Sequence, residues 1–371
     1  MLPHLHFGIV VVLNFVIGLL TPPMGLVLFV TAKVAVMQVN DLIRNVLPFF
    51  IPLVITHCTG FDILNREGLR DMQPKGIVTA MVTPTDEAGK VNQSSLRNLA
   101  NYLIDSGVHG LFPVGSQGEC WAFTPDEKRQ IIEVVVDEAR GRVPVYAGTG
   151  AITTQQAVEL AKIARSAGAA AISVLTPFYI KPNEDELFEH YKAIAEAVPD
   201  LPVLLYGNRD RTGIGLSPDF VARCSRIDNV VGIKDSSGDM TVAAEYIRRT
   251  RGAKEFSVLA GRDTLIYGFL CYGGKGAIAA TSNVAPRLVV EVYEAFMAGD
   301  MKRSLEAQYR LAPLRIAFEL GTFPAVIKEA LNLLGMDVGP SVRPVGPLPE
   351  AKRAELKRVL ADLGLSVVSG P

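Results

Sequence analysis

Lys234 has the side chain and the position for covalent chemistry. It ends an apolar run, residues 230–233, that is typical of a buried strand. Burial disfavours the charged ammonium and favours the free amine, which can attack a carbonyl carbon. The alternative is a strand-end lysine that is paired with a carboxylate. The residues that end the other apolar runs help to choose between the two.

Hydroxyls, a glycine-rich loop and a guanidinium follow other apolar runs. The loop at 115–119 (GSQGE) offers short donors that suit a carboxylate, although the same residues can form an ordinary turn. Tyr206 can move protons to and from a carbinolamine hydroxyl, or be a half-buried structural tyrosine. Arg211 can bind a second substrate carboxylate, or form a surface ion pair with Asp210 or Asp219.

Short apolar runs alternate with longer amphipathic stretches from residue 76 onward. Stretches such as 154–167 and 184–197 have apolar residues at helical spacing. Eight strand–helix units predict an α/β fold, the (β/α)₈ TIM barrel, in which the loops after the strands meet at one end. The predicted strands are 76–82, 110–114, 143–147, 170–175, 203–206, 230–234, 258–260 and 276–279.

The chain divides into three predicted parts. Residues 1–70 form a hydrophobic segment, 71–286 the catalytic barrel, and 287–371 a C-terminal helical extension with breaks near Gly299, Gly321 and 335–340. No charged side chain occurs from Phe7 to Ala32, which reaches the roughly 20 residues needed to cross a bilayer. A short membrane-like helical segment is therefore expected before the barrel, although Pro22 and Pro23 interrupt it.

Six motifs follow one another along the barrel region. They are GIVTAMVTP (76–84), GSQGE, VPVYAGTG (143–150), TPFYIKP (176–182), Tyr206 with Arg211-Thr212-Gly213, and GIKDSSGD (232–239). Residues from about 75 to 363 thereby resemble the dihydrodipicolinate synthase / N-acetylneuraminate lyase family of Schiff-base 2-oxo-acid lyases.

The resemblance implies a role for each strand-end residue. Lys234 would form an imine with pyruvate or another 2-oxo acid, and Tyr206 would be the proton shuttle. Ser116 and Gln117 would hold the 2-oxo-acid carboxylate, and Ser116 would have a catalytic role as well. Tyr179 would enter the neighbouring subunit's site, so a homodimer or homotetramer is expected. Thr83, directly after the first predicted strand, and Ile278, within the last, complete the predicted substrate-binding set.

The implied chemistry makes or breaks a carbon–carbon bond without a cofactor other than the covalent imine. The protonated imine accepts electrons, so a proton can leave C3 and the enamine can attack an aldehyde; the reverse sequence cleaves an aldol. The five histidines and four cysteines show no metal-binding spacing, and no catalytic metal is expected.

Two loops depart from the synthases that make the lysine precursor. Ser116-Gln117 replaces a Thr-Thr pair, and Gly207–Asp210 replaces Asn-Val-Pro-Gly before Arg211. Arg211 favours a substrate with a distal carboxylate, as in aspartate semialdehyde. The altered loop favours a catabolic relative: a sugar-acid aldolase, a sialate lyase or a hydroxyproline-pathway deaminase.

The first 60 residues have a separate resemblance. NFVIGLLTPPMG (14–25) and RNVLPF (44–49) resemble the C-terminal end of the large membrane subunit of tripartite ATP-independent periplasmic transporters. About 55 residues are too few for a transport pathway. A fusion or start-site remnant is expected, which leaves open membrane association through residues 7–57.

Charge and cysteine usage restrict the partners. Lys plus Arg total 37 and Asp plus Glu total 38, a balance that gives no reason to expect nucleic acid as a partner. Scattered cysteines fit a cytoplasmic catalytic domain. Two functions of other classes stay open, a membrane transport component and a catalytically silent binding barrel.

Overall fold

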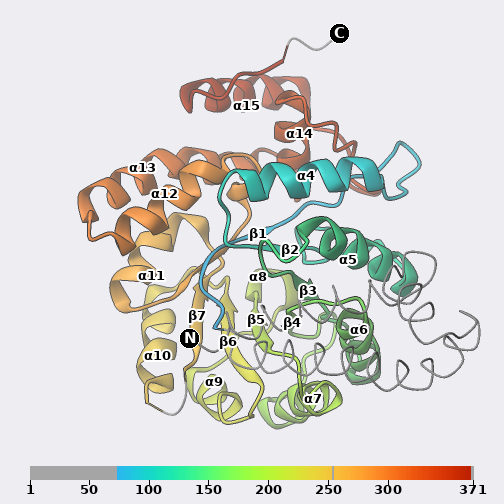
Figure 1. The fold of residues 1–371 in the computed structure, drawn as a ribbon, viewed down its shortest axis with the longest axis vertical. Coiled ribbons are helices and arrows are strands. Elements are labelled where there is room, and N and C mark those ends of the chain that lie inside the picture. Colours follow the sequence, from blue (N-terminus) through green and yellow to red (C-terminus); the bar gives the residue numbers. More distant parts are fainter. Residues whose placement is uncertain (1–72, 253–254, 369–371) are drawn as a thin grey trace, which may run out of the picture. The chain divides into compact units, whose positions relative to one another are not determined.

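A computed structural model of the protein describes residues 73–252 and 255–368, and in these ranges eight parallel strands form one sheet (Figure 1). Their order is β2-β1-β8-β7-β6-β5-β4-β3, and a parallel bridge between Leu111 and Val145 joins the two end strands. The sheet thus closes into the predicted TIM barrel. The strands are β1 (Gly76–Ala80), β2 (Gly110–Phe112), β3 (Tyr146–Gly148), β4 (Ala171–Leu175), β5 (Val203–Gly207), β6 (Val230–Asp235), β7 (Ser257–Ala260) and β8 (Gly276–Ala279).

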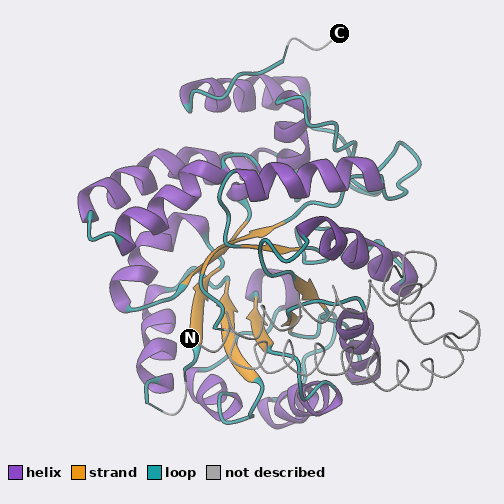
Figure 2. Ribbon diagram, viewed as in Figure 1, coloured by secondary structure: helices purple, strands orange, loops and turns teal. Residues whose placement is uncertain are grey.

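Helices follow the strands and lie around them (Figure 2). Two begin with a capping box, formed by Thr124 with Glu127 and by Asn183 with Glu186, in which side chains satisfy the free N–H groups of the first turn. The helices of the barrel region are α4 (Gln93–Asp105), α5 (Pro125–Ala139), α6 (Thr154–Ser166), α7 (Glu184–Ala197), α8 (Arg209–Thr212), α9 (Pro218–Cys224), α10 (Met240–Thr250), η1 (Asp263–Leu265), α11 (Ile266–Tyr272) and η2 (Thr281–Asn283).

The C-terminal region is helical, as predicted. It consists of α12 (Pro286–Met297), α13 (Met301–Ala317), η3 (Phe318–Leu320), α14 (Ala325–Leu333) and α15 (Glu350–Asp362). The breaks fall after Met297, at Gly321 and in 334–349, close to the predicted ones. This region supplies residues to the site described below.

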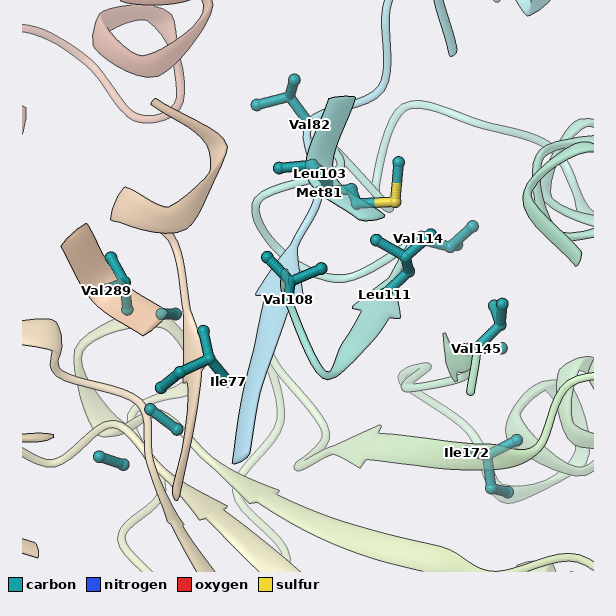
Figure 3. Close-up of a cluster of buried hydrophobic side chains, with 14 of the residues drawn as sticks. Ile77, Met81, Val82, Leu103, Val108, Leu111, Val114, Val145, Ile172 and Val289 are labelled. Carbon is teal, nitrogen blue, oxygen red and sulfur yellow. The ribbon is translucent and has the colours of Figure 1, made fainter. Parts of the chain in front are cut away.

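Buried side chains form two clusters because strand residues alternate in direction. One fills the barrel interior and includes Phe112, Tyr146 and Ile278. The other lies between strands and helices; Figure 3 shows part of it, with Ile77, Leu111 and Ile172 on strands and Leu103 and Val289 on helices. Lys234 and Tyr206 are therefore presented by a rigid framework.

Expectations for the first 70 residues lie outside the described ranges. Neither the membrane-like helical segment nor the 1–70 boundary is tested there. Among the helices that are described, none is both long and apolar enough to cross a membrane.

Candidate active site

Lys234 points into the barrel interior near the C-terminal end of β6. It is in register with Tyr206 on β5 and Leu259 on β7, and it is only 5 % exposed. Its Nζ lies 4.2 Å from the centroid of the Tyr206 ring and 5.0 Å from that of Phe112. No carboxylate in the described ranges forms an ion pair with it, so the alternative of a paired strand-end lysine is wrong.

The Tyr206 hydroxyl lies among polar groups. Asn208 Nδ2 donates to it at 3.1 Å, and Ser116 and Ser236 line the same cavity. Burial raises the pKa of the phenol, but the Lys234 charge and hydrogen bonding by neighbouring side chains together outweigh burial and lower the pKa. A phenol tuned in this way beside an amine can exchange protons during catalysis.

A cavity of about 380 Å³ opens above these two residues. Its lining includes Ser116, Gln117, Tyr206, Arg211, Lys234 and Ile278, so six of the eight predicted site residues are brought together. A larger hollow of about 1060 Å³, between α14 and 335–348, contains none of the eight.

The loop from Gly115 to Glu119 forms one wall of this cavity. Gly118 N donates to Gly115 O at 3.0 Å, and Glu119 N donates to Ser116 O at 3.2 Å, so the loop is a tight turn. Gln117 is 3 % exposed, and neither polar atom of its amide has a hydrogen-bond partner in the described structure. Because unpaired buried amides are costly, an amide that lines a cavity suits a polar ligand such as a carboxylate.

The loop fits only because β3 ends in glycine. A Cβ on Gly148 would lie 2.1 Å from the Val114 carbonyl oxygen, closer than atoms can approach. Val114 itself has φ 58°, in the left-handed region that a β-branched residue rarely adopts. The backbone before Ser116 is therefore fixed by packing against β3.

Arg211 reaches the cavity from α8. Its guanidinium carbon lies 4.2 Å from the centroid of the Phe323 ring, a stacked geometry that orients the group. Asp210 pairs with Arg262, and Asp219 pairs with Arg249. The expected alternative, an ion pair of Arg211 with either aspartate, is therefore wrong.

Thr83 and Tyr179 are not brought into the cavity of this chain. The Thr83 hydroxyl donates to Gly118 O at 2.8 Å, so it supports the loop from behind and does not line the cavity. Tyr179 is 94 % exposed with φ 74°, outside the site of its own chain. Its contribution to a neighbouring site stays a prediction.

Sequence reasoning missed several residues in or beside the cavity. Phe112 does not line the cavity, but its ring centroid lies 5.0 Å from Lys234 Nζ. It could have been found, since it faces inward on β2 by alternation from Gly110. Asn208 lies two residues after Tyr206, in the loop that departs from the resembling family. Arg262 follows β7 and therefore had a strand-end signal, although it was not named as a site residue. Phe323 gave no sequence signal, because the fold alone brings it to the cavity.

A buried, unpaired lysine at the strand ends of a (β/α)₈ barrel, beside a tuned tyrosine, defines the class of Schiff-base-forming barrel enzymes. The chain matches the Dihydrodipicolinate synthetase family over residues 73–363. It therefore belongs to this family, whose members are lyases and synthases, and it is an enzyme of that kind. Residues 1–58 match the DctM component of the tripartite ATP-independent periplasmic transporter.

Named relatives agree with this assignment. A 4-hydroxy-tetrahydrodipicolinate synthase of Methanoculleus marisnigri is 41% identical over 292 residues, covering 78% of this chain and 99% of the relative. The structure of dihydrodipicolinate synthase from Aquifex aeolicus has TM-score 0.77 and 33% identity, covering 80% of this chain and 100% of that one. A prophage protein of the same family from E. coli K12, solved with pyruvate, has TM-score 0.76 and 34% identity, covering 78% and 99%. One solved relative is described as a monomeric variant.

Proposed function

We propose that the chain is a 4-hydroxy-tetrahydrodipicolinate synthase-like enzyme that forms an imine between Lys234 and pyruvate or another 2-oxo acid. The observation that carries this proposal is the unpaired Lys234 amine at the base of a cavity, in contact with Tyr206. The names of the relatives and the pyruvate complex of one of them support the same substrate class.

The carboxylate of pyruvate fits the wall formed by Ser116 and Gln117. The unpaired Gln117 amide can donate to one carboxylate oxygen, and the hydroxyl of Ser116, the neighbouring residue on the same cavity wall, can donate to the other. This places C2 of the ligand toward the Lys234 amine.

Imine formation then needs two proton transfers. The neutral Lys234 amine attacks C2, and Tyr206 relays a proton from the nitrogen to the oxyanion, which gives the carbinolamine. Tyr206 then gives its own proton to the carbinolamine hydroxyl, which leaves as water with the electron pair of the C–O bond while the nitrogen lone pair forms the protonated imine. The protonated imine withdraws electrons from C3, the Tyr206 phenolate takes the proton that is lost there, and the enamine is the nucleophile for the second substrate.

The second substrate is an aldehyde or, in the cleavage direction, its aldol. Arg211, oriented by Phe323, is placed to bind a distal carboxylate of that substrate, as in aspartate semialdehyde. The Asp210–Arg262 pair at the same wall has no counterpart in the expected loop and favours the alternative of a catabolic aldolase, sialate lyase or deaminase of the same family.

Assembly and location form part of the proposal. Exposed Tyr179 has the position to reach a second copy of the chain, which supports a homodimer or homotetramer. We place the catalytic barrel in the cytoplasm, where pyruvate is available, with residues 1–58 as a segment that does not take part in the chemistry.

Borohydride reduction in the presence of pyruvate tests this function. Peptide mass spectrometry should locate the adduct on Lys234, and Lys234→Ala should give none while its unfolding curve shows a folded protein. An adduct on another lysine, or none on folded protein with any 2-oxo acid, would refute the Schiff-base assignment.

A further inference from the structure

A buried ion pair connects the site loop to the C-terminal extension. Glu119 is the last residue of the loop, and its Oε2 lies 2.8 Å from Nζ of Lys328 on α14. The two side chains are 0% and 2% exposed. The pair lies outside the cavity lining, so it does not touch a ligand there.

Hydrogen bonds hold both members of this pair. The Lys328 ammonium donates to Thr85 Oγ1 at 2.9 Å and to Pro340 O at 2.7 Å. Its contact with Glu119 Oε2 is an ion pair without hydrogen-bond geometry. Glu119 Oε1 accepts from Val342 N at 2.8 Å. The pair therefore joins the segment after β1, the loop after β2 and the 338–342 segment.

Thr85 and the 338–342 segment are in direct contact as well. Thr85 N donates to Val338 O at 3.1 Å, and a Cβ on Gly339 would lie 1.7 Å from Thr85 O. On the other side, Asn332 of α14 bonds both Gly339 O and Val338 N. The groups that hold Glu119 are thus themselves fixed.

Glu119 needs such support because its backbone is strained. Its φ is 54°, in the left-handed region that is unfavourable for residues other than glycine. Its N–H donates to Ser116 O, so Glu119 is bonded directly to the turn that carries Ser116 and Gln117.

Stability alone does not explain a buried charge pair. Two charges lose more solvation than two apolar side chains of similar size, and such pairs are often replaced without loss of stability. Directional bonds do offer a fixed geometry, which apolar contacts do not. The turn is a place where geometry matters, since Ser116 and Gln117 line the cavity together with Tyr206 and Lys234.

We infer that Glu119 and Lys328 are positioning residues that hold Ser116 and Gln117 in the geometry that binds the 2-oxo-acid carboxylate. The inference rests on the proposed function, because it assigns the carboxylate to that wall of the cavity. It makes the C-terminal extension a part of the binding site without contact with the ligand.

The test compares two variants with a matched control. Glu119→Gln keeps the shape of the side chain and an oxygen for Val342 N but leaves the Lys328 charge unpaired. Glu119→Gln combined with Lys328→Met removes both charges and is the deciding variant, because it leaves no buried unpaired charge. Glu329→Gln is the control: Glu329 lies on α14 next to Lys328, but its 2.5 Å ion pair is with Arg353 on α15 and does not involve the loop.

The rate of borohydride-trapped imine formation is measured against pyruvate concentration, with unfolding followed in parallel. We expect the half-saturating pyruvate concentration to rise about tenfold or more in the folded double variant, since small displacements of a binding group are costly. The rate at saturating pyruvate should change less, and the control should match the parent.

An unchanged half-saturating concentration in the folded double variant would overturn the inference, even if the variant had lost stability. If the parent and the Glu329→Gln control trap no imine at all, the proposed function is refuted and the inference falls with it. Imine trapping by the parent protein distinguishes these two failures, because it occurs in the first case and is absent in the second.

Discussion

Replacing Tyr206 by phenylalanine removes one oxygen atom from the site and little else. The ring stays, and with it the contact with Lys234 Nζ at 4.2 Å from the ring centroid. What is lost is the hydroxyl to which Asn208 donates at 3.1 Å, in the cavity that Ser116 and Ser236 also line. The variant therefore separates proton transfer from the positioning of the amine.

Tyr206→Phe is expected to lower the reaction rate much more than the stability of the protein. Loss of an acid–base group lowers rates by about 10² to 10⁴, which corresponds to roughly 2.7–5.4 kcal/mol in the activation free energy. The cost in stability is smaller, about 1 kcal/mol, for the hydrogen bonds to the hydroxyl. A large fall in rate with a small fall in stability is the expected combination.

The assay is the rate of imine trapping with pyruvate, measured with urea unfolding of the same samples. Tyr246→Phe is a matched control, because it removes a buried hydroxyl that donates to Leu216 O at 2.6 Å, outside the cavity. A Tyr206→Phe rate equal to that of Tyr246→Phe would show that the proton travels by another group.

Three further outcomes are expected. Arg211→Lys should raise KM for an aldehyde that carries a distal carboxylate, by about tenfold, and leave pyruvate trapping unchanged, because lysine cannot stack on Phe323 or bind bidentately. Burial lowers the pKa of His190 to about 4, so the free energy of unfolding of the parent protein should fall as pH falls from 6.5 towards 4. In urea unfolding, His190→Gln should lose less of its free energy of unfolding over the same range. Deletion of residues 1–72 should leave pyruvate trapping by the barrel unchanged, since the family match begins at residue 73.

The sign of the His190 effect follows from linkage. Its folded pKa lies below its unfolded value of about 6.5, so the unfolded chain binds more protons between these values and is stabilised relative to the folded protein as pH falls. At pH 5 the loss is roughly 1 to 2 kcal/mol. Equal pH dependence in parent and His190→Gln would contradict it. For Arg211→Lys, a rise in the pyruvate requirement would contradict the assigned role, and for the deletion, loss of trapping in folded protein would show that the N-terminal segment contributes.

The framework of the site could be predicted because strands have local signals. All eight strands were expected within a few residues of their observed ends, and Lys234, Tyr206 and the GSQGE loop converge as barrel topology requires. Thr83 shows the limit of this reasoning. Its place at a strand end suggested ligand contact, but its hydroxyl donates to Gly118 O instead.

Contacts between distant segments could not be predicted in the same way. Phe323 stacks on Arg211, and Lys328 pairs with Glu119, more than 100 and 200 positions away along the chain. No periodicity or spacing encodes such pairs, because they depend on how the helical extension packs on the barrel. A buried lysine in an apolar helix, as at Lys328, was the one available signal.

The closure of the barrel between β2 and β3 has a consequence for where the protein opens. A bridge at Leu111–Val145, with Leu111 N donating to Pro144 O and Gly148 N to Pro113 O, joins the two strands. Pro113 and Pro144 have no N–H to donate, so the ladder there cannot be extended through them. In a hydrogen-exchange experiment this seam would be the first part of the sheet to take up deuterium, while the ladders around Lys234 stay protected. The junction between β2 and β3 is therefore the least protected part of the barrel sheet, and it lies directly before the loop that carries Ser116.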